Sequence, residues 1–124
     1  MSPQAIIVEL LMLYLDIGAQ TQDISIAAKW GECCRSEFRA QVLKEVEMGV
    51  PPTAYMMGLE SDLKYYQLQT GFVSGFVLPL WQVFASCIPD LEFAATQFES
   101  NVAFYKEQVQ CLHLSDPPSP RSDI

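Results

Sequence analysis

The segment Glu60–Ile88 has the sequence ESDLKYYQLQTGFVSGFVLPLWQVFASCI, and its apolar residues recur with the spacing of a helix. The positions that set this spacing are Leu63, Tyr66, Leu68, Phe72 and Phe76. A helix is therefore predicted to begin near Glu60. Proline lacks the backbone N–H that an interior helical residue donates, so Pro79 either kinks this helix or ends it. Leu80–Ile88 continues as helix or as a new turn, and the whole segment indicates an all-α protein.

Stretches on both sides of this segment show the same helical spacing. Gln4–Leu15 follows Pro3, which is tolerated in a first helical turn. A second, long helix begins at a cap formed by Asp23 or Ser25, and a last helix begins at Pro89–Asp90. No repeat and no β-alternation competes with this pattern. The sequence therefore predicts an all-α helical bundle of four to five helices.

The second helix has an apolar face and a charged face. Its apolar positions recur every four residues and are Ile26, Trp30, Cys34, Phe38, Val42 and Val46. The opposite face carries charged residues, Arg35 among them, and is expected to be solvated surface. Gly49 ends this helix, and Pro51–Pro52 enforces an extended loop that runs to about Gly58.

The two ends of the chain have unusual compositions. Apart from Glu9, the first helix is apolar on every face, and such a helix is normally buried on all sides. The last residues of the chain include three prolines and are typical of a disordered Pro/Ser-rich tail. We therefore expect one domain over residues 1–112 and a tail over residues 113–124.

The composition excludes several classes of partner. The 124 residues include seven Lys+Arg and fifteen Asp+Glu, a formal net charge of −8. Nucleic acids and anionic membranes attract clustered basic residues, so neither is an expected partner. No stretch resembles a secretory signal, and none is expected to be long enough to cross a bilayer. Charged residues make up only 18% of the chain, which indicates apolar surface that a protein partner, or the missing N-terminal part of a larger domain, would cover.

The cysteines and the histidine limit which disulfides and metal sites this chain could form. Cys33 and Cys34 are adjacent while Cys87 and Cys111 are distant, which is not a disulfide framework, so we expect reduced thiols in a cytoplasmic protein. His113 is the single histidine, which excludes a self-contained multi-histidine metal site. The sequence contains no Gly-rich phosphate loop, no G-x-S-x-G and no H-E-x-x-H. These generic patterns alone assign no function.

Four motifs stand in a fixed order along the chain. The first is LDIGAQ at residues 15–20, with Trp30 fourteen residues after its aspartate, and the second is SEFRAQVL at residues 36–43. The third is the loop Gly49–Gly58. The fourth is QTGFV at residues 69–73, followed by PLW at residues 79–81.

Together these motifs resemble the C-terminal third of the catalytic domain of class I 3′,5′-cyclic-nucleotide phosphodiesterases. That family has A-D-I/L-S-N-P with a Trp fourteen residues after the Asp, then E-E-F-F/Y-x-Q-G-D, then G-x-x-x-S-P-M-x-D-R. The last family motif is Q-I/V-G-F-I-x-x-x-x-x-P-L-W, which is the most specific match. The resemblance covers Ala5 to Val109 of this chain.

The resemblance implies a function for four residues. The family hydrolyses cAMP or cGMP to the 5′-monophosphate with a zinc and a second divalent metal, typically magnesium, held by two His and two Asp. Asp16 matches one of these metal ligands. Gln69 matches the glutamine that pairs with the purine, Phe72 the aromatic that stacks on it, and Cys34 the apolar residue on the other side of the base. Without the family spacing, Phe72 would be read as plain core and Gln69 as a surface or interhelical polar residue.

The sequence also departs from the family pattern. Where the family has Ser-Asn shortly after the metal-binding Asp, this chain has Gly18–Ala19. Where the family has Gly-Asp after the glutamine that matches Gln41, this chain has Val42–Leu43. The Asp-Arg pair at the end of the family's loop is replaced by Met57–Gly58. The family's H-N-x-x-H and H-D motifs, which supply the other metal ligands and the general acid, do not occur in this chain. No catalytic residue is therefore predicted here, and the sequence leaves open whether the chain is itself an enzyme.

Three functions agree with these observations. The first is a truncated phosphodiesterase that carries the purine pocket and is inactive alone. The second is a non-catalytic helical module that packs onto another chain or onto a complete phosphodiesterase. The third is a degenerate binding domain for cyclic nucleotides, and the sequence does not distinguish cAMP from cGMP.

Overall fold

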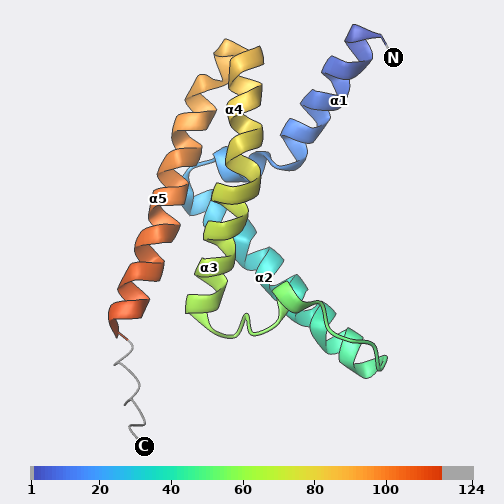
Figure 1. Cartoon of the computed structure of the whole chain (residues 1–124), viewed down its shortest axis with the longest axis vertical. Coiled ribbons are helices and arrows are strands. Elements are labelled where there is room, and N and C mark those ends of the chain that lie inside the picture. Colours follow the sequence, from blue (N-terminus) through green and yellow to red (C-terminus); the bar gives the residue numbers. More distant parts are fainter. Residues whose placement is uncertain (1, 116–124) are drawn as a thin grey trace, which may run out of the picture.

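The structure is a computed structural model and describes residues 2–115 (Figure 1). Its elements are α1 (Pro3–Asp16), η1 (Gly18–Thr21), α2 (Ile24–Glu47), η2 (Ala54–Met56), α3 (Asp62–Phe72), η3 (Val73–Val77), α4 (Leu78–Cys87), η4 (Pro89–Leu91) and α5 (Glu92–Ser115). The part of the chain that the structure describes contains helices and loops but no strand, which confirms the predicted all-α class. Asp23 caps α2, accepting a hydrogen bond from the Ser25 backbone N–H at 2.9 Å.

Pro79 does not end the central helix, because the turn before it is a π-helix. The segment Val73–Val77 forms this π turn between α3 and α4, and the helix is continuous from Asp62 to Cys87. In a regular α-helix the proline ring would clash with the carbonyl of Gly75, and a wider turn at that place relieves the clash. Of the two alternatives left open by the sequence, Leu80–Ile88 therefore continues as helix up to Cys87.

The same continuous helix corrects the expectation that no stretch is long enough to cross a bilayer. Asp62–Cys87 spans 26 residues and is apolar enough to do so by length and composition. One side of it is nevertheless packed inside the protein, with Val73, Val77 and Trp81 all fully buried. Core helices of globular proteins pass the same test, so these residues do not establish a transmembrane segment.

The hydrophobic core lies between this central helix and α5, which run side by side in Figure 1. Trp81 of α4 and Phe98 of α5 are both fully buried, and their rings are stacked with centroids 6.3 Å apart. Tyr14, near the end of α1, contacts the same cluster, with its ring centroid 4.0 Å from that of Trp81. The core therefore fixes the C-terminal end of α1, and with it the start of η1, against α4.

The rest of α1 extends away from the other helices (Figure 1), and none of its described residues is buried. Its exposed apolar side chains include Ile7, Met12 and Leu15, which are 52%, 62% and 73% exposed. A helix that is apolar on every face was expected to be buried on all sides. Within residues 2–115 it is not: Leu10 and Leu11 face the end of α4 across a small cavity, and no side chain of α1 is buried. The predicted apolar face of α2 is also largely uncovered, because Ala27 and Gly31 are the buried residues of that helix.

The last helix continues past the predicted domain boundary. α5 runs to Ser115, so residues 113–115, which were assigned to the tail, are helical. The remaining tail residues, 116–124, lie outside the described residues.

Candidate functional site

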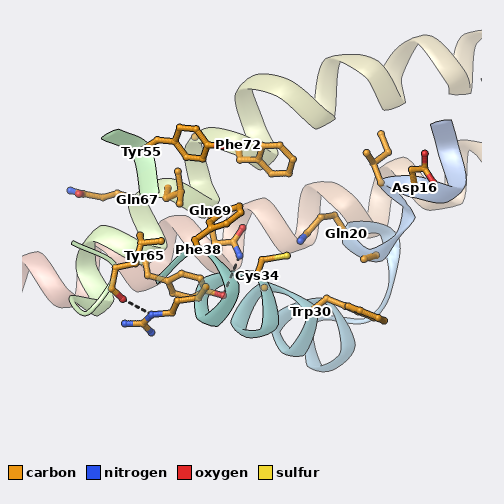
Figure 2. Close-up of a pocket in the computed structure, with 17 residues that line it drawn as sticks. Asp16, Gln20, Trp30, Cys34, Phe38, Tyr55, Tyr65, Gln67, Gln69 and Phe72 are labelled. Carbon is orange, nitrogen blue, oxygen red and sulfur yellow. Dashed lines mark hydrogen bonds between the residues drawn. The ribbon is translucent and has the colours of Figure 1, made fainter. Parts of the chain in front are cut away.

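A pocket of about 730 Å³ lies between the end of α1, η1, α2, the loop that contains η2, and α3 (Figure 2). Its walls are mainly apolar and aromatic, and they include Trp30 and Phe38 of α2, Tyr55 of η2 and Leu68 of α3. A cavity of this size with a few polar groups among apolar walls is typical of a small-molecule site.

All four residues that the sequence singled out line this one pocket. Asp16 is the last residue of α1, Cys34 lies on α2, and Gln69 and Phe72 lie one helical turn apart on α3. Figure 2 shows Asp16 at one end of the pocket, with Cys34, Gln69 and Phe72 near its middle. The fold thus brings together residues that are up to 56 positions apart in the sequence.

Gln69 is held by its neighbours. The side chain is only 8% exposed, and its Nε2 donates a hydrogen bond to the Tyr65 hydroxyl at 3.1 Å. Gly31 of α2 lies against this pair, and a Cβ at residue 31 would stand 2.5 Å from the Tyr65 hydroxyl and closer still to Gln69 Nε2. Burial raises the pKa of Tyr65, so its hydroxyl stays protonated at neutral pH. The amide oxygen of Gln69 is not used in this hydrogen bond.

Phe72 belongs to the wall of the pocket and not to the core. It is 45% exposed, and its ring stacks on that of Phe76 with centroids 5.7 Å apart and an interplanar angle of 17°. Cys34 faces the same space from α2 (Figure 2). Partial burial, with the nearby charge of Glu37, raises the pKa of the Cys34 thiol, so this sulfur acts as a small apolar surface and not as a thiolate.

Arg35, which the sequence assigned to a solvated face, is a structural part of the site. Its side chain is only 12% exposed and forms an ion pair of 2.9 Å with Asp62. Its Nε donates to the Leu59 carbonyl oxygen at 2.6 Å, and its guanidinium lies 4.7 Å from the Tyr65 ring centroid. Arg35 therefore fixes the loop before α3 against α2. Sequence spacing gave no signal for this role, because the partners lie more than twenty positions away.

Sequence reasoning also missed Gln20 and Asn101. Gln20 lines the pocket from η1 and is 8% exposed, and its Oε1 is buried without a hydrogen-bond partner. Asn101 of α5 is fully buried, and its Nδ2 donates to the main-chain oxygens of Gln20 and Gln22. The composition of the sequence offers no signal for this pair, which is 81 positions apart.

The described residues do not form a metal site by themselves. Residues 2–115 contain no group of three or more His, Cys, Asp and Glu that could hold a metal ion. Asp16 is the carboxylate that lines the pocket. His113 lies on α5, where its Nε2 is 3.4 Å from the Nε2 of Gln67, and it does not line the pocket. One carboxylate is a poor site for a zinc or a magnesium ion, which take at least three or four protein or water ligands.

Comparison with known proteins identifies the family. The model of the 3′5′-cyclic nucleotide phosphodiesterase family matches residues 2–98, which include every residue that lines the pocket. No curated protein and no solved structure matches this chain. The match covers more than half of the 124 residues and agrees with the resemblance seen in the four sequence motifs. The chain therefore belongs to the 3′5′-cyclic nucleotide phosphodiesterase family.

Proposed function

We propose that this chain carries the purine-binding part of a cyclic-nucleotide phosphodiesterase site and does not hydrolyse cAMP or cGMP by itself. The observation that supports this most directly is the pocket, because Asp16, Cys34, Gln69 and Phe72 come from three elements and line one cavity. In the proposed complex, the Gln69 amide hydrogen-bonds the edge of the base. Phe72 and Cys34 contact its two faces.

The geometry of Gln69 supports this assignment. Its Nε2 is anchored by Tyr65, which fixes the orientation of the amide and leaves Oε1 to accept from a ligand. The Phe72 ring is nearly half exposed and is already stacked on Phe76, so it offers a flat apolar face at little further cost in side-chain entropy. A planar heteroaromatic ring fits both features.

Hydrolysis needs groups that these residues do not supply. A two-metal reaction on a phosphodiester requires a metal cluster, a bridging hydroxide and a general acid. Asp16 offers one carboxylate to such a cluster, so the other ligands would come from residues other than these 124. We further propose a cytoplasmic location, which the four free cysteines support.

The absence of activity is testable with the purified full chain. It is incubated with cAMP or cGMP in the presence of Mg²⁺ and Zn²⁺, with Asp16→Ala as the control variant. We expect no turnover above the buffer rate for either protein. Turnover that disappears in Asp16→Ala would contradict the proposal, since the chain would then contain its own catalytic site.

Base binding is tested separately by equilibrium dialysis with cAMP and cGMP. Gln69→Met keeps the side-chain volume and removes the amide, and Gln82→Met makes the same change on the exposed part of α4. We expect a loss of affinity of about threefold to tenfold for Gln69→Met, the size of one net hydrogen bond, and none for Gln82→Met. Equal affinities for both variants would argue against a base-binding role of Gln69.

A second candidate function is a non-catalytic module that packs on another chain. The observation that favours it is α1, whose apolar side chains are exposed along its length. Contiguous apolar surface of this kind marks an interaction site in many proteins. Sedimentation of the purified chain distinguishes the two: a monodisperse monomer at all concentrations would speak against a missing partner.

A further inference from the structure

Gln20 combines a fixed backbone with an unused side chain. Its main-chain oxygen accepts a hydrogen bond of 2.8 Å from Asn101 Nδ2, which holds η1 against α5. The side chain is 8% exposed, yet its Oε1 has no hydrogen-bond partner. Leaving a buried amide oxygen unpaired is unfavourable, and an apolar side chain of the same shape would avoid this. Structure alone therefore gives no reason for a glutamine at this position.

The direction of the Gln20 side chain indicates that a ligand in the pocket would be the hydrogen-bond partner of its amide. In Figure 2, Gln20 extends from η1 toward Gln69 and Cys34, and the three side chains line the same pocket. Gln69 enters from α3 and Gln20 from η1, so two buried amides approach one cavity from different elements. A primary amide has both a donor and an acceptor group. The Gln69 amide is held by Tyr65, whereas the Gln20 amide can present either group by rotating half a turn.

The charges around the pocket limit the class of ligand. Arg35 is the cation that lines the pocket, and its guanidinium is already bound to Asp62 and to the Leu59 carbonyl oxygen. Asp16 places a carboxylate at one end of the pocket. A phosphate group entering this pocket would meet a negative charge and no available positive one, which is unfavourable. The remaining polar groups suit an uncharged ring.

We propose that Gln20 is a second ligand-binding amide of this pocket and that, with Gln69, it binds the edges of an uncharged heteroaromatic ring such as the base of a nucleoside. This inference rests on the proposed function, in which Gln69 binds the base. It adds a contact from η1 and identifies the uncharged nucleoside, rather than its phosphate, as the part of the ligand that this chain recognises.

The test combines binding with stability on the full chain. Adenosine, guanosine, cAMP and cGMP are titrated calorimetrically into the wild type, Gln20→Met, Gln69→Met and the control Gln82→Met, and the melting temperature of each ligand-free protein is recorded. For Gln20→Met we expect nucleoside affinity to fall about threefold to tenfold, the equivalent of one hydrogen bond. Its melting temperature should be unchanged or higher, because the variant removes an unpaired buried oxygen.

These opposite effects separate a ligand contact from a structural one. A lower melting temperature for Gln20→Met would overturn the inference, since the amide would then stabilise the fold. Unchanged affinity in Gln20→Met with a loss in Gln69→Met would overturn the inference and leave the proposed function standing. Absence of binding by all four ligands would contradict both. Cyclic nucleotides that bind ten times more tightly than the nucleosides would overturn the uncharged class of ligand.

Discussion

Asn101 of α5 binds the main-chain oxygen of Gln20 through its Nδ2, at 2.8 Å, across 81 positions of sequence. The same Nδ2 donates to the Gln22 oxygen at 2.9 Å, and the Asn101 Oδ1 accepts from Gln97 Nε2 at 3.1 Å. Asn101 is fully buried, and its bond to the Gln20 oxygen is buried, while the bonds to Gln22 and Gln97 are partly buried. The segment that carries Gln20 and follows Asp16 is therefore positioned by one side chain of the last helix.

Replacing Asn101 should loosen this segment. Asn101→Leu leaves the Gln20 and Gln22 oxygens unpaired. Each lost partner costs about 1–3 kcal/mol, so we expect a loss of about 2–6 kcal/mol in the free energy of unfolding. Ser100→Ala, on the exposed side of the same helix, is the matched control. Urea unfolding measures the stability, and hydrogen exchange should show faster exchange in residues 18–22. A variant as stable as the control would mean that other contacts hold η1.

The contact of Gly31 with Gln69 gives a second prediction. Alanine in place of an interior helical glycine normally stabilises by about 1 kcal/mol. At Gly31 the new methyl group would meet the Tyr65 hydroxyl and the Gln69 amide and break their hydrogen bond. Gly71→Ala is the control, since a Cβ there meets nothing within 4 Å.

We therefore expect Gly71→Ala to be more stable than the wild type and Gly31→Ala to be less stable than Gly71→Ala by about 1–2 kcal/mol. Gly31→Ala should also weaken nucleoside binding as much as Gln69→Met does. Thermal unfolding and calorimetry measure the two effects. If both glycine variants gain the same stability, the side chains of Gln69 and Tyr65 adapt without loss, and Gly31 is not needed for their arrangement.

Local sequence patterns predicted the helices well and their tertiary roles only in part. Pro3, Asp23 and Gly49 mark helix ends because capping and chain reversal depend on nearby residues. Pro79 remained ambiguous because a π turn, which the sequence does not signal, absorbs its steric clash. Arg35 was assigned to solvated surface because its partners, the loop before α3 and Asp62, are remote in sequence.

The pocket was predictable only through the family motifs. Spacing within α3 places Gln69 and Phe72 on one face, but nothing local indicates that Cys34 and Asp16 lie opposite. Gln20 was missed because it replaces the proline of the family motif and has no precedent in the pattern. Its burial depends on Asn101, a contact that neither periodicity nor composition can indicate.

The core tyrosine Tyr105 should make stability fall at alkaline pH. Its side chain is fully buried, its hydroxyl has no hydrogen-bond partner, and burial raises its pKa to about 12, with smaller contributions from Tyr65, Tyr66 and Glu32. In the unfolded chain the tyrosine hydroxyl loses its proton at about pH 10. Between about pH 10 and pH 12 the folded state therefore binds more protons than the unfolded state. Stability is therefore fully present below about pH 10 and is lost as the pH rises toward about 12.

The loss assigned to Tyr105 is about 2–3 kcal/mol over that range. Tyr105→Phe removes the titrating group and the unpaired hydroxyl, so we expect equal or higher stability at pH 7 and a shallower decline above pH 10. Burial also raises the pKa values of Tyr65 and Tyr66, so the stability of Tyr105→Phe should still decline somewhat above pH 10. Urea unfolding at pH 7 and pH 11 provides the comparison. Parallel declines for the variant and the wild type would show that Tyr105 does not titrate in this range.

The exposed apolar side of α1 should drive self-association of the isolated chain. Met12 and Leu15 are 62% and 73% exposed and belong to a helix with no buried residue, so replacing both with lysine removes apolar surface without opening the core. Leu114 is 87% exposed near the end of α5, and Leu114→Lys makes the same kind of change away from α1.

Sedimentation over a range of concentrations should show wild-type species larger than a monomer, and the α1 double variant should shift toward the monomer. Circular dichroism should stay helical in both variants, because neither substitution removes a packed side chain. Leu114→Lys should sediment like the wild type, since one isolated apolar residue contributes little association. If the wild type is a monomer throughout, or if Leu114→Lys has the same effect as the double variant, α1 does not act as an association surface, and the non-catalytic module loses its main support.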